Sequence, residues 1–434
     1  MKILLKNALV LTENGGFVKG GNVVVNDKFI VSINAEPPIG DFDRVIDCEN
    51  KLLMPGFYNT HCHAAMTLFR GIGEDLPLQR WLEEKIYPAE DRLTPESVRI
   101  GSLLAAAEMI RGGCVSFSDM YFFSDETAKV VLETGMKANI SRCLVSFSDD
   151  ATIVGDSRFE EASRLFDDFN GAGEGRVIID AAVHAEYTNK AKYCREVAES
   201  AHLRGQNIQV HVSETKREHE ECMARNSGMT PVEFLLNNGI LAPTQTSTAT
   251  AAHCVWVTEH DMELLSENKV TVAHNPVSNL KLASGVANVP KLLEKGVNVG
   301  LGTDGAASNN KLSMLRELQT AALIHKGVNY RADIIPTPKF IEMATANGAR
   351  AQGRPDCGVI APGKKADLIL IDLDELSNIP SYDPYSTVAF STDNRDVCLT
   401  MCDGKILFEN GEFTTIDVEK LRHDAKETIA HYFD

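Results

Sequence analysis

The chain has 434 residues, of which 44% are hydrophobic and 24% charged, so its composition is that of an ordinary globular protein. A formal net charge of −18 argues against nucleic acid or an anionic membrane as a partner, because phosphate groups are bound by lysine and arginine. Ten cysteines without a Cys-x-x-Cys pair, and no apolar stretch of roughly 20 residues, predict a cytoplasmic protein with reduced thiols and no membrane span.

Short predicted β-strands occupy residues 1–55, where β-branched residues alternate with polar ones between Gly, Asn and Asp turns. Residues 56–360 follow another pattern, in which short apolar runs are each followed by a longer stretch with helical periodicity. Eight such runs occur, and in chain order they are LMPGFYNTHCH, CVSFSDMY, KANISRCLV, RVIIDAAVH, NIQVHVSE, TSTATAAHC, KVTVAHNP and VNVGLGTDG. Residues 361–434 return to short strands and end in one helical segment, VEKLRHDAKETIAHYF.

Strands that alternate with helices predict an α/β fold with a parallel sheet. Eight units over about 300 residues fit a (β/α)8 TIM barrel better than an open doubly wound sheet. No Gly-x-Gly-x-x-Gly or Walker sequence follows any run, which also argues against an open, nucleotide-binding sheet. We expect residues 56–360 to form the barrel, and the two chain ends, 1–55 and 361–434, to pair into a small β-sandwich domain beside it.

Half of the twelve histidines stand at the C-terminal ends of the apolar runs. They are His61, His63, His184, His211, His253 and His274. In a TIM barrel these strand ends meet at one mouth, where the catalytic residues of this fold lie. Six buried imidazoles that each need hydrogen-bond partners are hard to explain as core residues, so we interpret them as an active site. The others are interpreted as surface or helix-flank residues: His202, His219, His260, His325, His423 and His431.

A metal site is predicted from the ends of three runs. His61 and His63 stand two apart on one strand, so both imidazoles point to the same face. His-x-His alone is a weak signal, but His211 ends the fifth run and Asp304 ends the eighth, and only a closed barrel brings these ends together. Three imidazoles and one carboxylate suit Zn²⁺, with Fe²⁺ or Mn²⁺ as alternatives. Taken alone, Asp304 is equally well explained as a turn residue before Gly305.

Two further residues suit acid–base chemistry beside such a metal. Glu214 lies three residues after His211, where a carboxylate can shuttle protons, although a glutamate at a helix start is also favoured by the helix dipole. His253 ends the sixth run and is placed to hydrogen-bond the attacking oxygen. The adjoining Cys62 and Cys254 are expected to point away from the site.

Several longer motifs resemble those of the amidohydrolase superfamily. They are MPGFYNTHCHAAMTLFRGIGEDLPLQRWL, HVSETKRE, AAHCVW, AHNPVSNLKLASG, LGTDGAASNN and PGKKADLILID. They stand in the expected order and cover nearly the whole chain. Within the superfamily the chain most resembles the 5-methylthioadenosine/S-adenosylhomocysteine deaminases. The resemblance implies a metal-centred barrel, a β-sandwich made from both chain ends, and hydrolytic deamination of adenine nucleosides.

Carried onto this sequence, the resemblance implies one divalent metal ion per chain and a set of proton-handling residues. The implied metal ligands are His61, His63, His211 and Asp304. The implied proton-handling residues are Glu214, His253 and Asp304. In the expected reaction the metal activates water and Asp304 accepts a water proton. Glu214 protonates the ring nitrogen beside the attacked carbon, and His253 stabilises the oxygen of the tetrahedral intermediate.

The resemblance also implies a substrate site. Its residues are Glu90 at the ribose hydroxyls, Arg142 and Arg158 near the 5′ substituent, and His184, Glu214 and Asp304. The arginines favour a carboxylate-bearing substrate such as S-adenosylhomocysteine, although either can instead form a structural ion pair. Glu186 departs from the family pattern, and if it points into the pocket it favours 5-methylthioadenosine or 5′-deoxyadenosine. His274 is expected to contact the substrate or to support the residues that do.

Three other functions are weighed against this one. Deamination of guanine or cytosine, or dechlorination of a triazine, would use the same mononuclear site. A dinuclear cyclic-amide hydrolase needs a carboxylated lysine at the fourth strand, and VIIDAAVH contains none. A non-catalytic scaffold is expected to have lost a ligand or the base, and none is missing. The expected partner is a small nucleoside, and the sequence leaves a homo-oligomer open.

Overall fold

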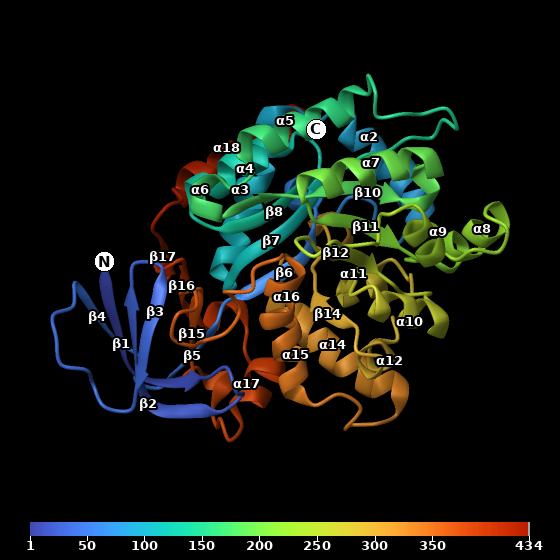
Figure 1. Ribbon diagram of the computed structural model, residues 1–434. Coiled ribbons are helices and arrows are strands. Elements are labelled where there is room, and N and C mark those ends of the chain that lie inside the picture. Colours follow the sequence, from blue (N-terminus) through green and yellow to red (C-terminus); the bar gives the residue numbers. More distant parts are fainter. Residues whose placement is uncertain (433–434) are drawn as a thin grey trace.

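Eight parallel strands close into a barrel at the centre of the computed structural model, which describes residues 1–432 (Figure 1). Their bounds are β6 (Phe57–Cys62), β7 (Cys114–Tyr121), β8 (Lys137–Arg142), β9 (Val177–Ile179) with β10 (Ala181–Ala185), β11 (Ile208–Val212), β12 (Ala249–His253), β13 (Thr271–His274) and β14 (Asn298–Leu301). β9 and β10 are halves of one strand interrupted at Asp180. The Thr60 hydroxyl of β6 donates to the Leu301 carbonyl of β14 at 2.9 Å, where the barrel closes. The predicted TIM barrel is confirmed.

Helices follow the barrel strands and surround the barrel (Figure 1). The longer ones are α3 (Pro95–Arg111), α4 (Ser124–Thr134), α5 (Ser157–Phe169), α7 (Ala191–Arg204), α8 (Lys216–Arg225), α9 (Pro231–Asn237), α10 (Glu259–Glu267), α14 (Met314–Asn329) and α15 (Thr337–Ala344). Short helices are η1 (Ala64–Phe69), α1 (Leu78–Trp81), η2 (Leu82–Ile86), α2 (Tyr87–Glu90), α6 (Ala172–Gly175), η3 (Glu186–Thr188), α11 (Pro276–Lys281), α12 (Val289–Glu294), α13 (Ala306–Asn309) and α16 (Ala346–Ala351). Four of the longer helices begin at a threonine whose hydroxyl accepts the backbone N–H three residues on, and this cap fixes where each helix begins. The capping residues are Thr94 for α3, Thr215 for α8, Thr230 for α9 and Thr258 for α10.

Strands from both chain ends form one sheet beside the barrel, at the left of Figure 1. They are β1 (Lys2–Leu11), β2 (Phe17–Asn26), β3 (Phe29–Asn34), β4 (Arg44–Asp47) and β5 (Lys51–Pro55), with β15 (Leu368–Asp372), β16 (Val397–Cys402), β17 (Lys405–Glu409) and β18 (Glu412–Phe413). β5 pairs antiparallel with β15, which joins the two ends. Ile3, Val25 and Leu399 share one core, so the expected pairing of the ends is confirmed, with all nine strands in one continuous sheet.

The C-terminal part of the chain also carries helices. They are η4 (Leu376–Asn378), α17 (Pro384–Phe390), η5 (Asn394–Asp396) and α18 (Val418–Tyr432). α18 is the predicted final helix, and it packs against α3 of the barrel. The last two residues of that expected segment, 433–434, lie outside the described residues.

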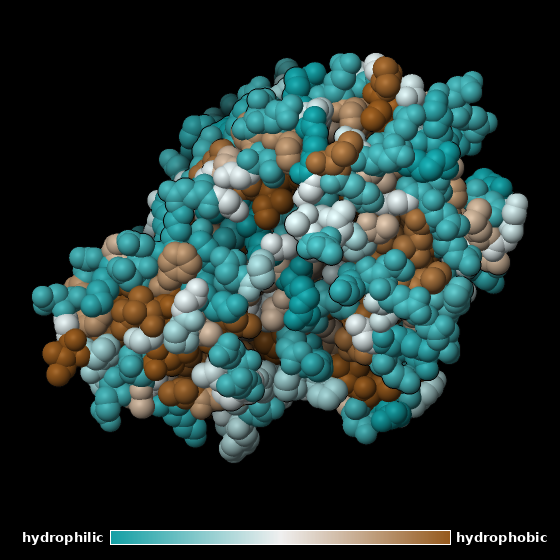
Figure 2. Space-filling view, in the orientation of Figure 1, coloured by the Kyte–Doolittle hydropathy of each residue, from teal (hydrophilic) through white to brown (hydrophobic). Residues whose placement is uncertain are grey.

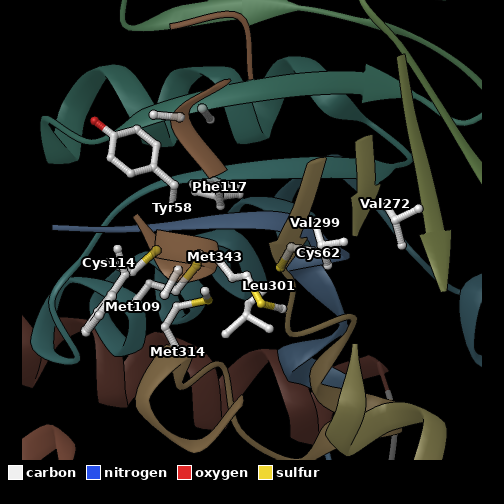
Figure 3. Close-up of a cluster of buried hydrophobic side chains, with 14 of the residues drawn as sticks. Tyr58, Cys62, Met109, Cys114, Phe117, Val272, Val299, Leu301, Met314 and Met343 are labelled. Carbon is white, nitrogen blue, oxygen red and sulfur yellow. The ribbon is translucent and has the colours of Figure 1, made fainter. Parts of the chain in front are cut away.

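The main hydrophobic core lies between the barrel strands and the surrounding helices (Figure 3). Val299 and Leu301 of β14 are fully buried there, beside Met314 of α14 and Met343 of α15. Cys62 belongs to the same core. Because neighbouring strand residues alternate in direction, its thiol points outward and the preceding histidine points into the barrel. Burial raises the pKa of the Cys62 thiol well above its usual range, so the thiol stays protonated.

A buried ionic cluster joins the end sheet to the barrel. Lys137 of β8 donates to both oxygens of Asp367 at 2.5 Å and to Asp403 at 2.6 Å. The Tyr58 hydroxyl of β6 also donates to Asp367. Burial raises the pKa of Asp367, but the Lys137 charge outweighs burial and holds that pKa at about 2. The cluster therefore anchors the base of β6, the strand that leads to the predicted metal site.

Hydrophilic side chains cover most of the face seen in Figure 2, with hydrophobic patches over the sheet of the two chain ends. Among residues 1–432, no helix combines the length and the hydropathy that a membrane crossing requires.

Candidate active site

Four predicted metal ligands meet at the C-terminal mouth of the barrel. His61 ends β6 together with Cys62, His63 follows it, His211 lies in β11 and Asp304 follows β14. The Nε2 atoms of His63 and His211 lie 3.3 Å apart. Asp304 Oδ1 lies 3.2 Å from His63 Nε2 and 3.6 Å from His61 Nε2. The structure therefore brings together, within a few ångströms, residues that the sequence separates by more than 200 positions.

Backbone carbonyls fix the tautomers of two of these histidines. The Nδ1–H of His63 donates to the Met120 carbonyl at 2.6 Å, and the Nδ1–H of His211 donates to the His184 carbonyl at 2.7 Å. A carbonyl oxygen can only accept, so Nδ1 carries the proton in each ring. In the neutral rings both Nε2 atoms then present lone pairs toward the same point. This is the arrangement that second-sphere contacts give to metal-binding histidines.

These donor atoms fit a divalent cation. The Nε2 atoms of His63 and His211 lie close enough for both to bind one cation. His61 Nε2 is buried without a hydrogen-bond partner. The ligand atoms of His61, His63 and His211 all lie within 4.8 Å of one another. Three imidazoles with a carboxylate form a donor set suited to zinc, so we regard the four residues as a candidate metal site.

The carboxylate of Asp304 governs the protonation of the histidines beside it. Burial lowers the pKa of His63, but the hydrogen bond and charge of Asp304 outweigh burial and raise it to about 9. Burial lowers the pKa of His61 to about 4, in spite of the same carboxylate. Burial raises the pKa of Asp304, yet its contacts with His61 and His63 hold it well below its usual range. A divalent cation would take the place of the proton that Asp304 holds on His63.

Asp304 is fixed from several sides. Its Oδ2 accepts hydrogen bonds from the hydroxyls of Ser278 at 2.6 Å and Ser308 at 2.9 Å, which leaves Oδ1 to face the histidines. Its φ is +59°, a left-handed conformation that costs a non-glycine residue of order 1–3 kcal/mol. Gly302, two residues before Asp304, lies against β6. A Cβ on Gly302 would lie 2.4 Å from Asn275 Oδ1 and 2.9 Å from the His61 backbone nitrogen, so only glycine lets this segment lie so close to His61.

Glu214 faces the same centre from the turn after β11. Glu218 of α8 accepts the backbone N–H of Ser213 and Glu214 at 2.8 Å each, and this holds a turn in which Ser213 has a φ of +47°. Ser284 donates to Glu214 Oε1 at 3.2 Å. Burial raises the pKa of Glu214, which favours a carboxyl group that can give a proton to a substrate.

His253 lies opposite Glu214, with its Nε2 3.9 Å from Glu214 Oε2. Its Nδ1 donates to Asn279 Oδ1 at 2.8 Å, and its φ is +73°. Burial lowers the pKa of His253, but the charges of Glu214 and Asp304 outweigh burial and raise it. A protonated Nε2 at this place can donate a hydrogen bond to an oxygen that develops negative charge.

A cavity of about 550 Å³ opens above these residues, a size that suits a small organic ligand. His63, His184, His211, Glu214, His253 and Asp304 line its inner end, and Glu90 of α2 lines its side. Burial raises the pKa of Glu90 to about 7, although Tyr121 and His63 oppose the shift. Glu90 and His184 therefore both line the cavity, and their contact with a substrate stays a prediction.

The two predicted substrate arginines do not line this cavity. Arg142 Nε donates to Glu161 at 2.8 Å, and its guanidinium packs 4.9 Å from the ring centroid of Phe122. Arg158 is partly exposed and pairs with Asp156 of its own helix start. The sequence predicts that both arginines contact a carboxylate of the substrate. The structure gives this prediction no geometric support, because both guanidinium groups bind neighbouring carboxylates of the protein instead.

Glu186 and His274 also turn away from the cavity. Glu186 is 4% exposed and accepts a hydrogen bond from Arg225 at 2.7 Å, so it does not point into the pocket. The Nε2 of His274 lies 3.1 Å from the Nε2 of His325, and both rings are buried. The sequence-based interpretation of His325 as a surface or helix-flank residue is wrong, because its ring is buried against His274. His219 is buried as well, 3.1 Å from the Ser213 hydroxyl.

Sequence reasoning missed the residues that hold the reactive groups. Ser278 and Asn279 lie in the AHNPVSNLKLASG motif, and Ser308 lies in LGTDGAASNN. Glu218 follows Thr215 in the T-x-x-E spacing of a capping box, a signal that was available in the sequence. The exposed Phe147 at the cavity mouth had no such signal, because its role depends on the path of the loop that follows β8.

Comparisons with known proteins agree with this fold. A 5′-deoxyadenosine deaminase from Methanosarcina acetivorans is 42% identical over 98% of this chain and 96% of its own. A 5-methylthioadenosine/S-adenosylhomocysteine deaminase from Syntrophomonas wolfei is 40% identical over 99% of this chain and 98% of its own.

Solved structures agree as well. An adenosine deaminase from Xanthomonas campestris with bound zinc superposes with a TM-score of 0.92 at 31% identity, over 99% of this chain and 98% of that one. The amidohydrolase family matches residues 52–407, which include the whole barrel and every candidate site residue. The chain therefore belongs to the amidohydrolase family.

Proposed function

We propose that this amidohydrolase deaminates adenine nucleosides that carry a 5′ substituent, and releases ammonia and the inosine-type product. The observation that carries the proposal is the convergence of three imidazole nitrogens and Asp304 with Glu214 and His253, all of which except His61 line one cavity. The two curated relatives described above are named for such nucleosides, which supports an adenine substrate.

We further propose that one zinc ion is held by His61, His63, His211 and Asp304, with Fe²⁺ or Mn²⁺ as alternatives. The zinc in the Xanthomonas structure supports this choice of metal. A bound divalent cation supplies a water molecule with a pKa near 7 and stabilises negative charge on oxygen. His63 and His211 keep their rings oriented for it through their hydrogen bonds to backbone carbonyls.

The chain's own residues then move the protons. Glu214 gives its proton to the ring nitrogen next to the amino-bearing carbon, which makes that carbon electrophilic. Asp304 takes one proton from the attacking water as the carbon–oxygen bond forms, and His253 donates a hydrogen bond to that oxygen. Asp304 passes its proton to the amino group, the carbon–nitrogen bond breaks, and ammonia leaves. Glu214 recovers a proton from the new oxygen, so the carbonyl product keeps its ring N–H and all protons balance.

The side of the cavity suits the sugar. Glu90 lies on the short helix α2 and lines the cavity, and its carboxylate can accept hydrogen bonds from ribose hydroxyls. Free adenine would forgo this contact, so it is expected to be a poor substrate.

The test is a kinetic comparison with purified, metal-analysed protein. Ammonia release and the absorbance change from adenine to hypoxanthine are followed for 5′-deoxyadenosine, 5-methylthioadenosine, S-adenosylhomocysteine, adenosine and adenine, with guanine and cytosine as competing candidates. The proposal expects turnover of the nucleosides and little of the free bases. Faster turnover of guanine or cytosine than of every nucleoside would contradict it.

A further inference from the structure

The structure points to a substrate with a small, uncharged 5′ substituent and to discrimination against a carboxylate-bearing one; this inference rests on the proposed deamination. It starts from the outer wall of the cavity, which we define as Leu78, Leu82, Phe122, Cys143, Val145 and Phe147. We propose that this outer wall sets the specificity of the enzyme for the 5′ end of the nucleoside.

The first argument is the charge of the cavity lining. In the described part of the chain, no lysine or arginine side chain lines the cavity. Four carboxyl groups do, those of Glu90, Asp91, Glu214 and Asp304. A substrate carboxylate would therefore find no lysine or arginine in the lining to pair with. A buried carboxylate without a partner loses its hydration without compensation.

The second argument is the position of Arg142, which is adjacent in sequence to a residue of the outer wall. Arg142 ends β8, next to Cys143 of the outer wall, but its guanidinium packs over the ring of Phe122, and the residue lines a separate cavity together with Glu161. Its Nε donates to Glu161, and its Nη1 donates to the Cys143 carbonyl at 2.6 Å. Both its charge and its donors are thus engaged by the protein. The side chain is only 11% exposed, so it cannot swing into the cavity without breaking these contacts.

The third argument is the chemistry that the wall itself presents. Phe122, Val145 and Phe147 offer two rings and a branched aliphatic side chain, and Leu78 and Leu82 of the α1–η2 segment also line the cavity. A methyl or methylthio group gains free energy when it leaves water against such surfaces. The longer amino-acid tail of S-adenosylhomocysteine must either bury its charges here or extend past Phe147, which is 69% exposed, and be ordered without a polar partner.

The test is the ratio of kcat/KM between substrates, measured on the metal-loaded enzyme. We expect 5′-deoxyadenosine and 5-methylthioadenosine to exceed S-adenosylhomocysteine by at least about tenfold, since an unpaired buried charge costs at least this much. A smaller difference, or S-adenosylhomocysteine as the best substrate, overturns the specificity proposal and leaves the deaminase function intact. If no adenine nucleoside releases ammonia, the proposed function itself is wrong and the specificity proposal falls with it.

Three variants make the test sharper, and each is read as a change in that ratio so that a loss of folded protein does not imitate the effect. Phe147→Arg places a cation on an exposed part of the wall and should raise the relative kcat/KM for S-adenosylhomocysteine about tenfold. Phe147→Leu is the matched apolar control and should leave the ratio unchanged. Arg142→Met should also leave the ratio unchanged. A selective loss of S-adenosylhomocysteine turnover in Arg142→Met would show that Arg142 binds the carboxylate, and would overturn the proposal.

Discussion

The buried pair between Lys137 and Asp367 allows a stability prediction that can be worked out from the structure. Asp367→Asn removes a carboxylate whose side chain is 0% exposed and leaves the ammonium of Lys137 with Asp403 as its remaining anionic partner. Breaking one side of a buried ion pair costs about 3–5 kcal/mol. Because Asp403 partly compensates, we expect a loss near the lower end, about 3 kcal/mol in the free energy of unfolding.

The pH dependence of this pair follows from its pKa. The folded pKa of Asp367, about 2, lies below its ordinary value of 3.8, so the folded state holds this proton more weakly than the unfolded state does. The resulting stabilisation, about 2 kcal/mol, is fully present above pH 4 and disappears as the pH falls from about 4 to 2.

The assay is urea unfolding of the wild type and of Asp367→Asn, followed by circular dichroism at several pH values between 7 and 3. The triple variant Lys137→Met, Asp367→Asn and Asp403→Asn should recover part of the loss, because it removes all three charges of the cluster. Equal unfolding midpoints for wild type and Asp367→Asn at pH 7 would refute the reasoning.

Three further predictions concern the site. His211→Ala should remove both bound metal and activity, as elemental analysis and an ammonia assay would show; full metal content in this variant would exclude His211 as a ligand. Glu214→Gln should keep the metal but lower kcat about 10²–10⁴-fold, the usual range for a general acid–base group, and near-wild-type turnover would reduce Glu214 to a helix-start residue. Glu218→Ala should leave metal content unchanged but destabilise the protein by about 1–3 kcal/mol and lower kcat, since two buried N–H groups lose their acceptor. Unchanged kcat and melting temperature would mean that Glu218 does not position Glu214.

Much of the site could be predicted because barrel topology converts a sequence position into a place in space. Each apolar run ends at the same mouth, so His61, His211 and Asp304 had to converge once the run count favoured a closed barrel. The contacts of Arg142 could not be predicted in this way. Its partner Glu161 lies 19 residues on, in α5, and the intervening loop has no regular pattern.

The same limit explains why the burial of His325 was not predicted. His325 lies in α14 among residues with ordinary helical spacing, and its burial depends on His274 of β13, 51 positions earlier. Side-chain pairs of this kind depend on how a helix rotates against the barrel, which local periodicity does not determine. The left-handed backbone of His253 and Asp304 was equally hidden, because tertiary contacts impose a strained conformation that local preference disfavours.

The most direct test of the account is a metal titration of stripped enzyme. The protein is freed of metal with a chelator, zinc is added back in measured equivalents, and the rate of ammonia release from 5′-deoxyadenosine is recorded at each step. The account predicts no turnover without metal and a rate that rises linearly and reaches its plateau at one zinc per chain. Turnover that survives complete metal removal, or a plateau only at two equivalents, would contradict it.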